Sequence, residues 1–230
     1  MSFEPRHVVS AFNGKDTVLA YSGDRVGVEV EKIGEIKLIS GGIVACDPFI
    51  CQDVGPFTRT VAPDSYPVRL AIARIPIEHP KVQFDRRIAY AGIFFSELPA
   101  ESWEMALLPS QNATDLAPGY YFGYPVDSAT GCFADVGAMD RIDAEMERNS
   151  NYLFNVLNLS DRTYIYTRSW DSITPPEGGG NIFIFVSGYG DGSYPSYFGL
   201  DAQGTPSCLV TDFLVLGGKA DEETESDAPD

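Results

Sequence analysis

Three aspartates stand in the two stretches of the sequence that combine carboxylates with glycine and other small residues. Asp127 and Asp135 flank Ser-Ala-Thr-Gly-Cys-Phe-Ala, and Asp191 lies within Ser-Gly-Tyr-Gly-Asp-Gly-Ser-Tyr. If the three carboxyl groups converged in the fold, they could hold a divalent cation or carry out acid–base chemistry. The candidate binding residues are therefore Asp127, Gly131, Asp135, Gly190, Asp191, Gly192 and Tyr194.

These residues also have a structural interpretation. Aspartate in a glycine-rich turn commonly accepts backbone amides of its own turn, which would occupy the carboxylate of Asp191. Asp135 stands just before a helical pattern that begins near Ala138, where it would cap the helix. Left-handed backbone at Gly190 or Gly192 would present Asp191 at the end of a strand. Both interpretations stay open at the level of the sequence.

The glycine-rich stretch that starts at Ser187 follows a strand-like run, as the glycines of a dinucleotide-binding site do. Such a site needs a helix directly after the glycines, whereas this sequence continues with Pro195 and residues that favour strands. A calcium loop needs acidic ligands at alternating positions and a final glutamate, which the run from Asp191 to Asp201 lacks. We therefore expect no nucleotide at this stretch, and the sequence offers no support for a calcium ion there.

Cysteine and histidine residues are few and scattered. The four cysteines are Cys46, Cys51, Cys132 and Cys208, and the two histidines are His7 and His79. Their spacing matches neither a zinc site nor a Ser-His-Asp or Cys-His arrangement. We expect buried, reduced thiols, with no cofactor and no metal.

Acidic residues outnumber basic residues about two to one. The chain has 33 Asp and Glu against 16 Lys and Arg, a net charge of −17, and residues 1–220 alone carry −11. This field repels nucleic acid and anionic membranes, so we expect neither as a partner. The sequence has no run of eighteen apolar residues and no apolar signal-peptide core at its start, which predicts a cytoplasmic protein.

One domain followed by a tail is the simplest organisation. Residues 219–230 are strongly acidic and contain no apolar side chain larger than alanine, which predicts a disordered tail. Residues 1–218 contain no internal repeat and no linker-like segment, which predicts a single globular domain.

Strand patterns dominate that domain. Alternating or short apolar runs bounded by Gly and Pro predict strands at 27–30, 36–39, 41–46, 66–75, 87–95, 103–108, 120–124, 163–168, 181–187 and 207–213. The runs 66–75 and 87–95 are expected to pair as a hairpin. One helical pattern covers 138–159 and is expected to break near Asn149. The fold class is therefore α+β and mainly β: antiparallel strands, as a sandwich or curved sheet, with one helix or helix pair packed on it.

The order of several motifs resembles one known family. These motifs are Ala-Cys-Asp-Pro-Phe at 45–49, Trp-Glu-Met-Ala at 103–106, the stretch 126–135, the Gly-Asp-Gly-Ser-Tyr block at 190–194 and Thr-Asp-Phe at 211–213. Together they resemble the bacterial family described as domain of unknown function 4241 (DUF4241). The family usually has glycine where this chain has Ala129. The resemblance implies a shared fold and favours the neighbourhood of Asp127, Asp135, Asp191 and Tyr194 as the site, and it implies no reaction.

Two functions are compatible with these observations. The first is a non-catalytic interaction protein of the cytoplasm, such as an immunity-type inhibitor, that binds a basic protein attracted by the acidic body. The alternative is an enzyme or ligand-binding domain that uses the aspartate cluster with or without a divalent metal. The position of the three carboxyl groups in the fold distinguishes the two hypotheses.

Overall fold

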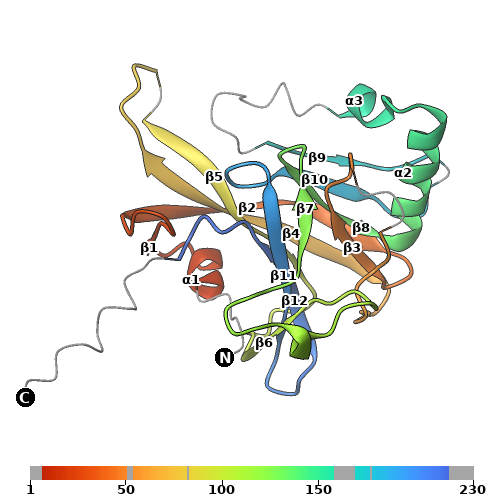
Figure 1. Ribbon diagram of the computed structural model, residues 1–230, viewed down its shortest axis with the longest axis horizontal. Helices are drawn as coiled ribbons and strands as arrows, with labels where there is room; N and C mark the ends of the chain where they lie inside the picture. Colours follow the sequence, from red (N-terminus) through yellow and green to blue (C-terminus); the bar gives the residue numbers. More distant parts are fainter. Residues whose placement is uncertain (1–6, 51–53, 82, 158–168, 177, 218–230) are drawn as a thin grey trace, which may run out of the picture.

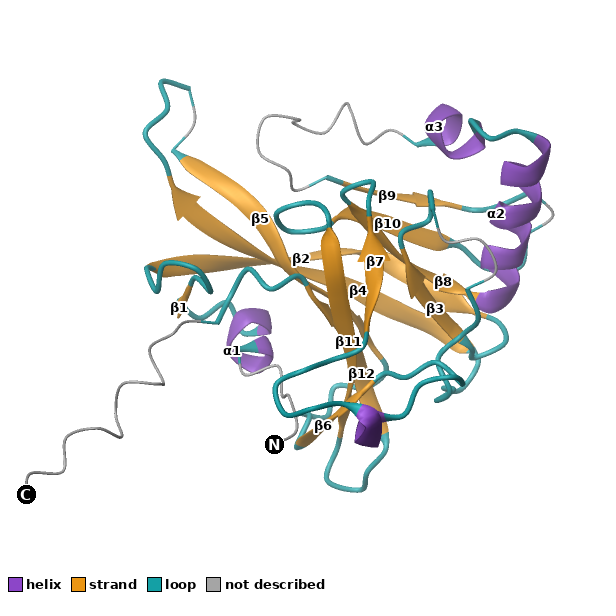
Figure 2. Cartoon of the chain, in the orientation of Figure 1, coloured by secondary structure: helices purple, strands orange, loops and turns teal. Residues whose placement is uncertain are grey.

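The structure is a computed structural model that describes residues 7–50, 54–81, 83–157, 169–176 and 178–217. Two antiparallel sheets and a few helices make up this part of the chain (Figures 1 and 2). The expectation of a mainly β fold with antiparallel strands and a helix pair is confirmed. The predicted tail at 219–230 and the predicted strand at 163–168 lie outside the described residues.

The larger sheet has eight strands. Its order is β1-β2-β4-β5-β12-β11-β6, and β7 also pairs with β11. These strands are β1 (Thr17–Val18), β2 (Arg25–Leu38), β4 (Asp64–Pro76), β5 (Phe84–Phe94), β6 (Ser102–Met105), β7 (Gly123–Val126), β11 (Gly192–Leu200) and β12 (Pro206–Asp212).

The predicted hairpin is the β4–β5 pair, whose register runs from Val68 opposite Ile93 to Pro76 opposite Phe84. The two runs expected at 27–30 and 36–39 are parts of the single long strand β2, which pairs with β4. The register shifts between Lys32 and Gly34, and the backbone of Gly34 has φ +147°. A Cβ at Gly34 would lie 2.8 Å from the ring of Phe183, so glycine lets the second sheet approach.

The smaller sheet has four strands in the order β3-β8-β10-β9. They are β3 (Ile43–Cys46), β8 (Thr130–Asp135), β9 (Trp170–Ile173) and β10 (Ile182–Val186). This sheet is covered on both faces: Phe183 and Phe185 face the larger sheet, while Ile182 and Ile184 belong to a second core under the helices. Strands with two buried faces consist of continuous apolar runs rather than alternating ones.

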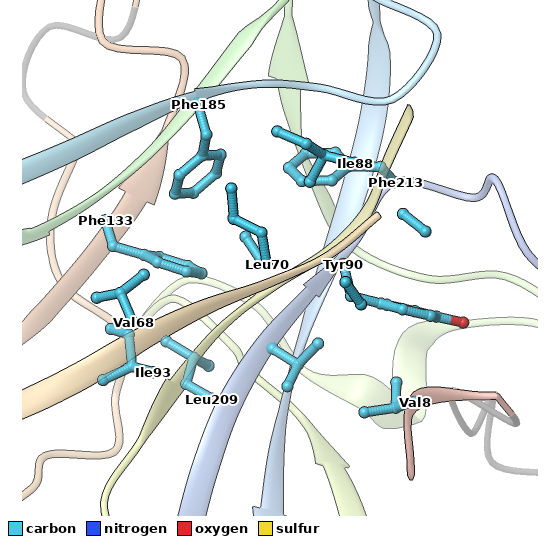
Figure 3. Close-up of a cluster of buried hydrophobic side chains, with 14 of the residues drawn as sticks. Val8, Val68, Leu70, Ile88, Tyr90, Ile93, Phe133, Phe185, Leu209 and Phe213 are labelled. Atoms are coloured by element: carbon cyan, nitrogen blue, oxygen red, sulfur yellow. The ribbon is translucent and has the colours of Figure 1, made fainter. Parts of the chain in front are cut away.

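The main core lies between the two sheets. Figure 3 shows the rings of Phe133 and Phe185 beside Val68 and Leu70 of the larger sheet. Phe133 and Phe185 meet edge to face at 5.1 Å between ring centroids. Aromatic pairs in this geometry add to the stabilisation that burial provides.

The helices cover the outer faces. α2 (Val136–Arg148) and α3 (Tyr152–Val156) pack on the smaller sheet, and the helical pattern breaks at Asn149 as expected. The short α1 (Val8–Phe12), which the sequence pattern did not predict, lies on the opposite face of the larger sheet. There the ring of Phe12 packs edge to face on Phe94 at 5.0 Å. A single 3₁₀ turn, η1 (Ala113–Asp115), follows β6.

In the described part of the chain, no helix has the length and hydrophobicity that a membrane span requires.

Candidate functional site

Two turns that contain candidate residues lie side by side at one end of the smaller sheet. The first, residues 127–129, joins β7 to β8, and the second, residues 187–191, joins β10 to β11. The amide of Ser187 donates to the carbonyl of Ala129 (3.0 Å), and the amide of Ala129 donates to Oδ1 of Asp191 (3.1 Å). We call these two turns the aspartate corner. The carboxylate of Asp191 therefore ties the two turns together.

A buried carboxylate that was not among the candidates anchors the aspartate corner. Asp47 has 0% exposure, and its Oδ2 accepts the amides of Asp127 (2.9 Å) and Ser128 (2.8 Å). Its Oδ1 accepts the Ser128 hydroxyl (2.7 Å) and the amide of Phe49 (3.0 Å). Charge-assisted bonds of this kind compensate the desolvation of a buried charge. The sequence did not indicate this role of Asp47, because its main partners lie about 80 positions away.

The glycine turn has the left-handed backbone that the sequence indicated, at Gly190 with φ +110°. The carbonyl of Gly190 accepts the hydroxyls of Ser187 (2.8 Å) and Tyr194 (2.7 Å). Tyr194 is buried, packs edge to face on Phe213 at 5.1 Å, and has a pKa raised to about 12, chiefly by burial. Its phenol therefore stays protonated at neutral pH and holds the turn.

Gly131 and Gly192 make room for tyrosine side chains. A Cβ on Gly131, which lies inside β8, would approach the hydroxyl of Tyr124 to 2.5 Å. A Cβ on Gly192, at the start of β11, would lie 3.0 Å from the ring of Tyr194. Neither glycine has φ in the left-handed region. Both positions serve close packing at the aspartate corner.

Asp135 lies at the opposite end of β8 from the other two candidate aspartates. Its Oδ1 accepts the amide of Gly137 (3.0 Å) and so caps α2, as the sequence indicated. Its Oδ2 accepts both the amide (2.8 Å) and the hydroxyl (2.7 Å) of Ser40. Strand β8 places it roughly 17 Å along the chain from Thr130 at the aspartate corner. The structure thus brings Asp127 and Asp191 to one corner and leaves Asp135 outside it.

The side chain of Asp127 is exposed, while its backbone amide bonds to Asp47. Asp135 lies apart from Asp127 and Asp191 because the stretch after Ala129 is a strand rather than a longer turn. Among the residues that the structure describes, no three His, Cys, Asp or Glu side chains form a group that could hold a metal ion. The hydrogen bonds of Asp47 and Asp191 join the two turns of the aspartate corner and tie them to the loop after β3.

A second acidic feature lies on α2. Asp140, Asp143 and Glu147 follow helical spacing and, with Val54 and Gly55, line a hollow of about 380 Å³. On the same helix, Arg141 donates to the carbonyl of Gly137 (2.8 Å), and Arg148 pairs with Glu145. These three acids were not among the predicted site residues.

A third buried carboxyl group is Asp212, at the end of β12. Its Oδ1 accepts the amide of Leu214 (2.7 Å), and burial raises its pKa to about 7. Burial and then the charge of Asp212 raise the pKa values of Tyr90, Tyr121 and Tyr197, so these phenols are neutral when Asp212 titrates. This group was not predicted as a candidate.

Residues 36–211 match the family model described as "Protein of unknown function (DUF4241)". The chain belongs to this family. The match covers β3, β8, β10 and β11 and therefore both turns of the aspartate corner. The chain matches no curated protein and no solved structure. Membership in DUF4241 thus includes the whole aspartate corner.

Proposed function

We propose that this DUF4241 protein acts by binding a basic protein in the cytoplasm, in the manner of an immunity-type inhibitor that masks its partner, rather than by catalysis. The observation that carries the proposal is the acidic hollow on α2. Asp140 and Glu147, which line this hollow, offer carboxylates to Lys or Arg side chains of a partner. The net charge of −17 would steer such a partner towards the protein.

The distribution of basic residues supports this proposal. Arginines on β4 and β5 pair with acids of the same chain: Arg74 and Arg86 both contact Glu29, at 3.2 and 3.4 Å. Arg87 pairs with Asp85 at 2.8 Å. These three arginines of the larger sheet are therefore partly neutralised by acids of the same chain, whereas Asp140 and Glu147 line the hollow on α2.

The engagement of the other carboxylates also favours binding over catalysis. Asp47 and Asp135 are buried, and their carboxylate oxygens accept hydrogen bonds from backbone amides and serine hydroxyls. One carboxylate oxygen of Asp191 accepts the amide of Ala129. A general base must instead direct a carboxylate oxygen to a substrate. The enzyme alternative also requires Asp135 at the aspartate corner, and this residue caps α2 at the other end of β8.

Affinity capture with the full-length chain tests the proposal. The chain is immobilised, a native lysate is applied at low salt with and without a chelator, and bound proteins are identified. We expect the same basic protein in both arms, released by salt and absent from a control bait of equal net charge. The identified protein should then lose its own activity at an equimolar ratio with the chain. Recovery of no specific protein, or of one only without the chelator, would contradict the proposal.

A further inference from the structure

Two cysteine thiols face each other across neighbouring strands of the smaller sheet. Cys46 of β3 and Cys132 of β8 stand directly opposite in the antiparallel register, and their Sγ atoms lie 3.6 Å apart. β3 and β8 run side by side at one edge of this sheet (Figure 1). Neither cysteine forms a disulfide in the structure. The two sulfur atoms are therefore close neighbours without a covalent bond between them.

The backbone at this pair suits a disulfide bond. Residues directly opposite in an antiparallel ladder have Cα atoms about 4.5–5.5 Å apart. Disulfides span Cα separations of about 4.4–6.8 Å, and their S–S bond is about 2.05 Å long. The sulfur atoms of Cys46 and Cys132 thus need to approach by about 1.5 Å, which side-chain rotation supplies while the strands keep their register.

The thiol of Cys208 has a different environment. Cys208 lies in β12 of the larger sheet, and its Sγ packs closely against Gly199 of β11. Burial raises the pKa of this thiol to about 11, so its reactive thiolate is scarce at neutral pH. Cys51 lies outside the described residues. Among the cysteines that the structure describes, the geometry therefore selects Cys46 and Cys132 as a pair.

Local opening of β3 gives an oxidant access to this pair. Cys46 and Cys132 both have 0% exposure and belong to the core under the helices. β3 has only four residues and ends the strand order of the smaller sheet, where it pairs with β8. Segments with few partners open locally at a lower free energy than the rest of a core does. Opening of β3 exposes both thiols together.

We propose that Cys46 and Cys132 are a reversible redox pair that closes to a cross-strand disulfide when a peroxide oxidises it. One thiolate attacks an oxygen of hydrogen peroxide, which yields a sulfenic acid and one molecule of water. The second thiol attacks the sulfenic sulfur and releases another molecule of water. Two thiols and one peroxide thus give one disulfide and two waters, and the sulfur atoms supply the two electrons that reduce the peroxide. An added dithiol reverses the reaction by thiol–disulfide exchange.

The disulfide couples oxidation to the anchoring of the aspartate corner. Asp47 directly follows Cys46, and its carboxylate accepts the amides of Asp127 and Ser128. A covalent link from β3 to β8 holds Asp47 beside these partners. The link also joins residues 86 positions apart, which restricts the unfolded chain. The oxidised protein is therefore the more stable form, and this inference does not depend on the proposed function.

Peroxide treatment of the full-length chain, followed by mass spectrometry, tests the inference. The variant Cys51→Ser/Cys208→Ala keeps only the two thiols of the pair. We expect hydrogen peroxide to remove two hydrogen atoms from its intact mass and to protect both thiols from alkylation, and dithiothreitol to restore both. Trypsin places Cys46 in the peptide 38–59 and Cys132 in the peptide 88–141, so a disulfide-linked pair of these peptides identifies the bond. The oxidised form should melt about 5–10 °C above the reduced form.

Two matched variants provide the controls. Cys46→Ala and Cys132→Ala, each added to the same background, leave one thiol of the pair and should give neither the linked peptides nor the rise in melting temperature. Circular dichroism shows whether the variants are folded.

The oxidised wild type supplies a measurement that does not depend on any variant, because fragmentation of its linked peptides should place the bond at Cys46 and Cys132. Two thiols that persist under peroxide, sulfinic acids without linked peptides, or a bond from Cys132 to Cys51 would each overturn the inference. A linked form that melts no higher than the reduced form would overturn the coupling to stability.

Discussion

At the scale of single residues, Asp47 shows how a buried carboxylate organises a site without reacting. Its two oxygens accept three backbone amides and one hydroxyl from the aspartate corner and its own loop. Replacement by asparagine turns one oxygen into an NH₂ group, which then faces amide donors. We expect Asp47→Asn to lower the free energy of unfolding by roughly 2–4 kcal/mol.

Urea unfolding measures this loss, and Asp127→Asn is the control. The side chain of Asp127 is exposed, so this substitution should change the stability by less than about 0.5 kcal/mol. An Asp47→Asn variant as stable as the control would show that the carboxylate of Asp47 does not anchor the aspartate corner.

Ala129 is the second residue whose conformation leads to a prediction. Its φ of +55° lies in the left-handed region, where an alanine Cβ is strained and glycine is not. Glycine is the residue that this backbone conformation favours. We expect Ala129→Gly to raise the free energy of unfolding by about 0.5–1 kcal/mol, measured by urea unfolding. A loss of stability would mean that the contacts of the Ala129 Cβ outweigh the strain.

At the scale of elements, β8 and β7 pack closely where Gly131 of β8 lies next to the phenol of Tyr124 of β7. A Cβ on Gly131 would lie 2.5 Å from the phenol oxygen of Tyr124, closer than packed atoms approach. We expect Gly131→Ala to cost roughly 1–3 kcal/mol of unfolding free energy, because overpacked cores relax only in part. Urea unfolding provides the measurement.

Removing the phenol oxygen tests the cause of this loss. The double variant Gly131→Ala/Tyr124→Phe should recover most of the stability relative to Tyr124→Phe alone. A double variant that stays as destabilised as the sum of its parts would place the clash elsewhere.

The elements also show how much of the fold the sequence could predict. The β4–β5 hairpin was predictable because one face is less buried near its ends, so apolar and basic residues alternate. β8 was not, because both faces are buried and its small residues looked like a turn. β11 begins at Gly192 and contains Pro195, and these two residues concealed a strand that pairs with β7, β6 and β12.

The candidate site was predictable only in its local parts. The left-handed turn at Gly190 and the helix cap at Asp135 depend on residues close in sequence, and both were expected. The bond from Ala129 to Asp191 and the anchoring by Asp47 join residues separated by 62 and 80 positions. Such partners depend on strand order, which local patterns do not encode. The acids of α2 were not among the predicted site residues, and their hollow exists only once the loop after β3 packs beside the helix.

At the scale of the whole molecule, the excess of acids and the buried Asp212 both tie stability to pH. The folded-state pKa of Asp212 is raised to about 7, whereas the unfolded chain has an ordinary aspartate. Between these two pKa values the folded state binds the proton and the unfolded state does not. Stability therefore falls as pH rises through this window and is lowest above pH 7.

Both effects act in the same direction, because repulsion within a chain of net charge −17 also grows as its acids ionise. Asp212→Asn separates the two effects. The variant keeps an oxygen for the amide of Leu214 and cannot ionise. We expect wild-type stability to fall by a few kcal/mol from pH 5 to pH 8, and the variant to fall by much less.

Added salt shows whether the pH dependence of stability that remains in Asp212→Asn comes from exposed charges. Exposed charges are screened at moderate salt, whereas a buried carboxylate is screened little. The residual slope of Asp212→Asn should therefore flatten with added sodium chloride, while the wild type should keep the part of its slope that Asp212 contributes. Urea unfolding across pH at two salt concentrations measures both terms. A wild-type slope that salt abolishes completely would assign the pH dependence to the acidic surface alone, the same surface that attracts the proposed basic partner.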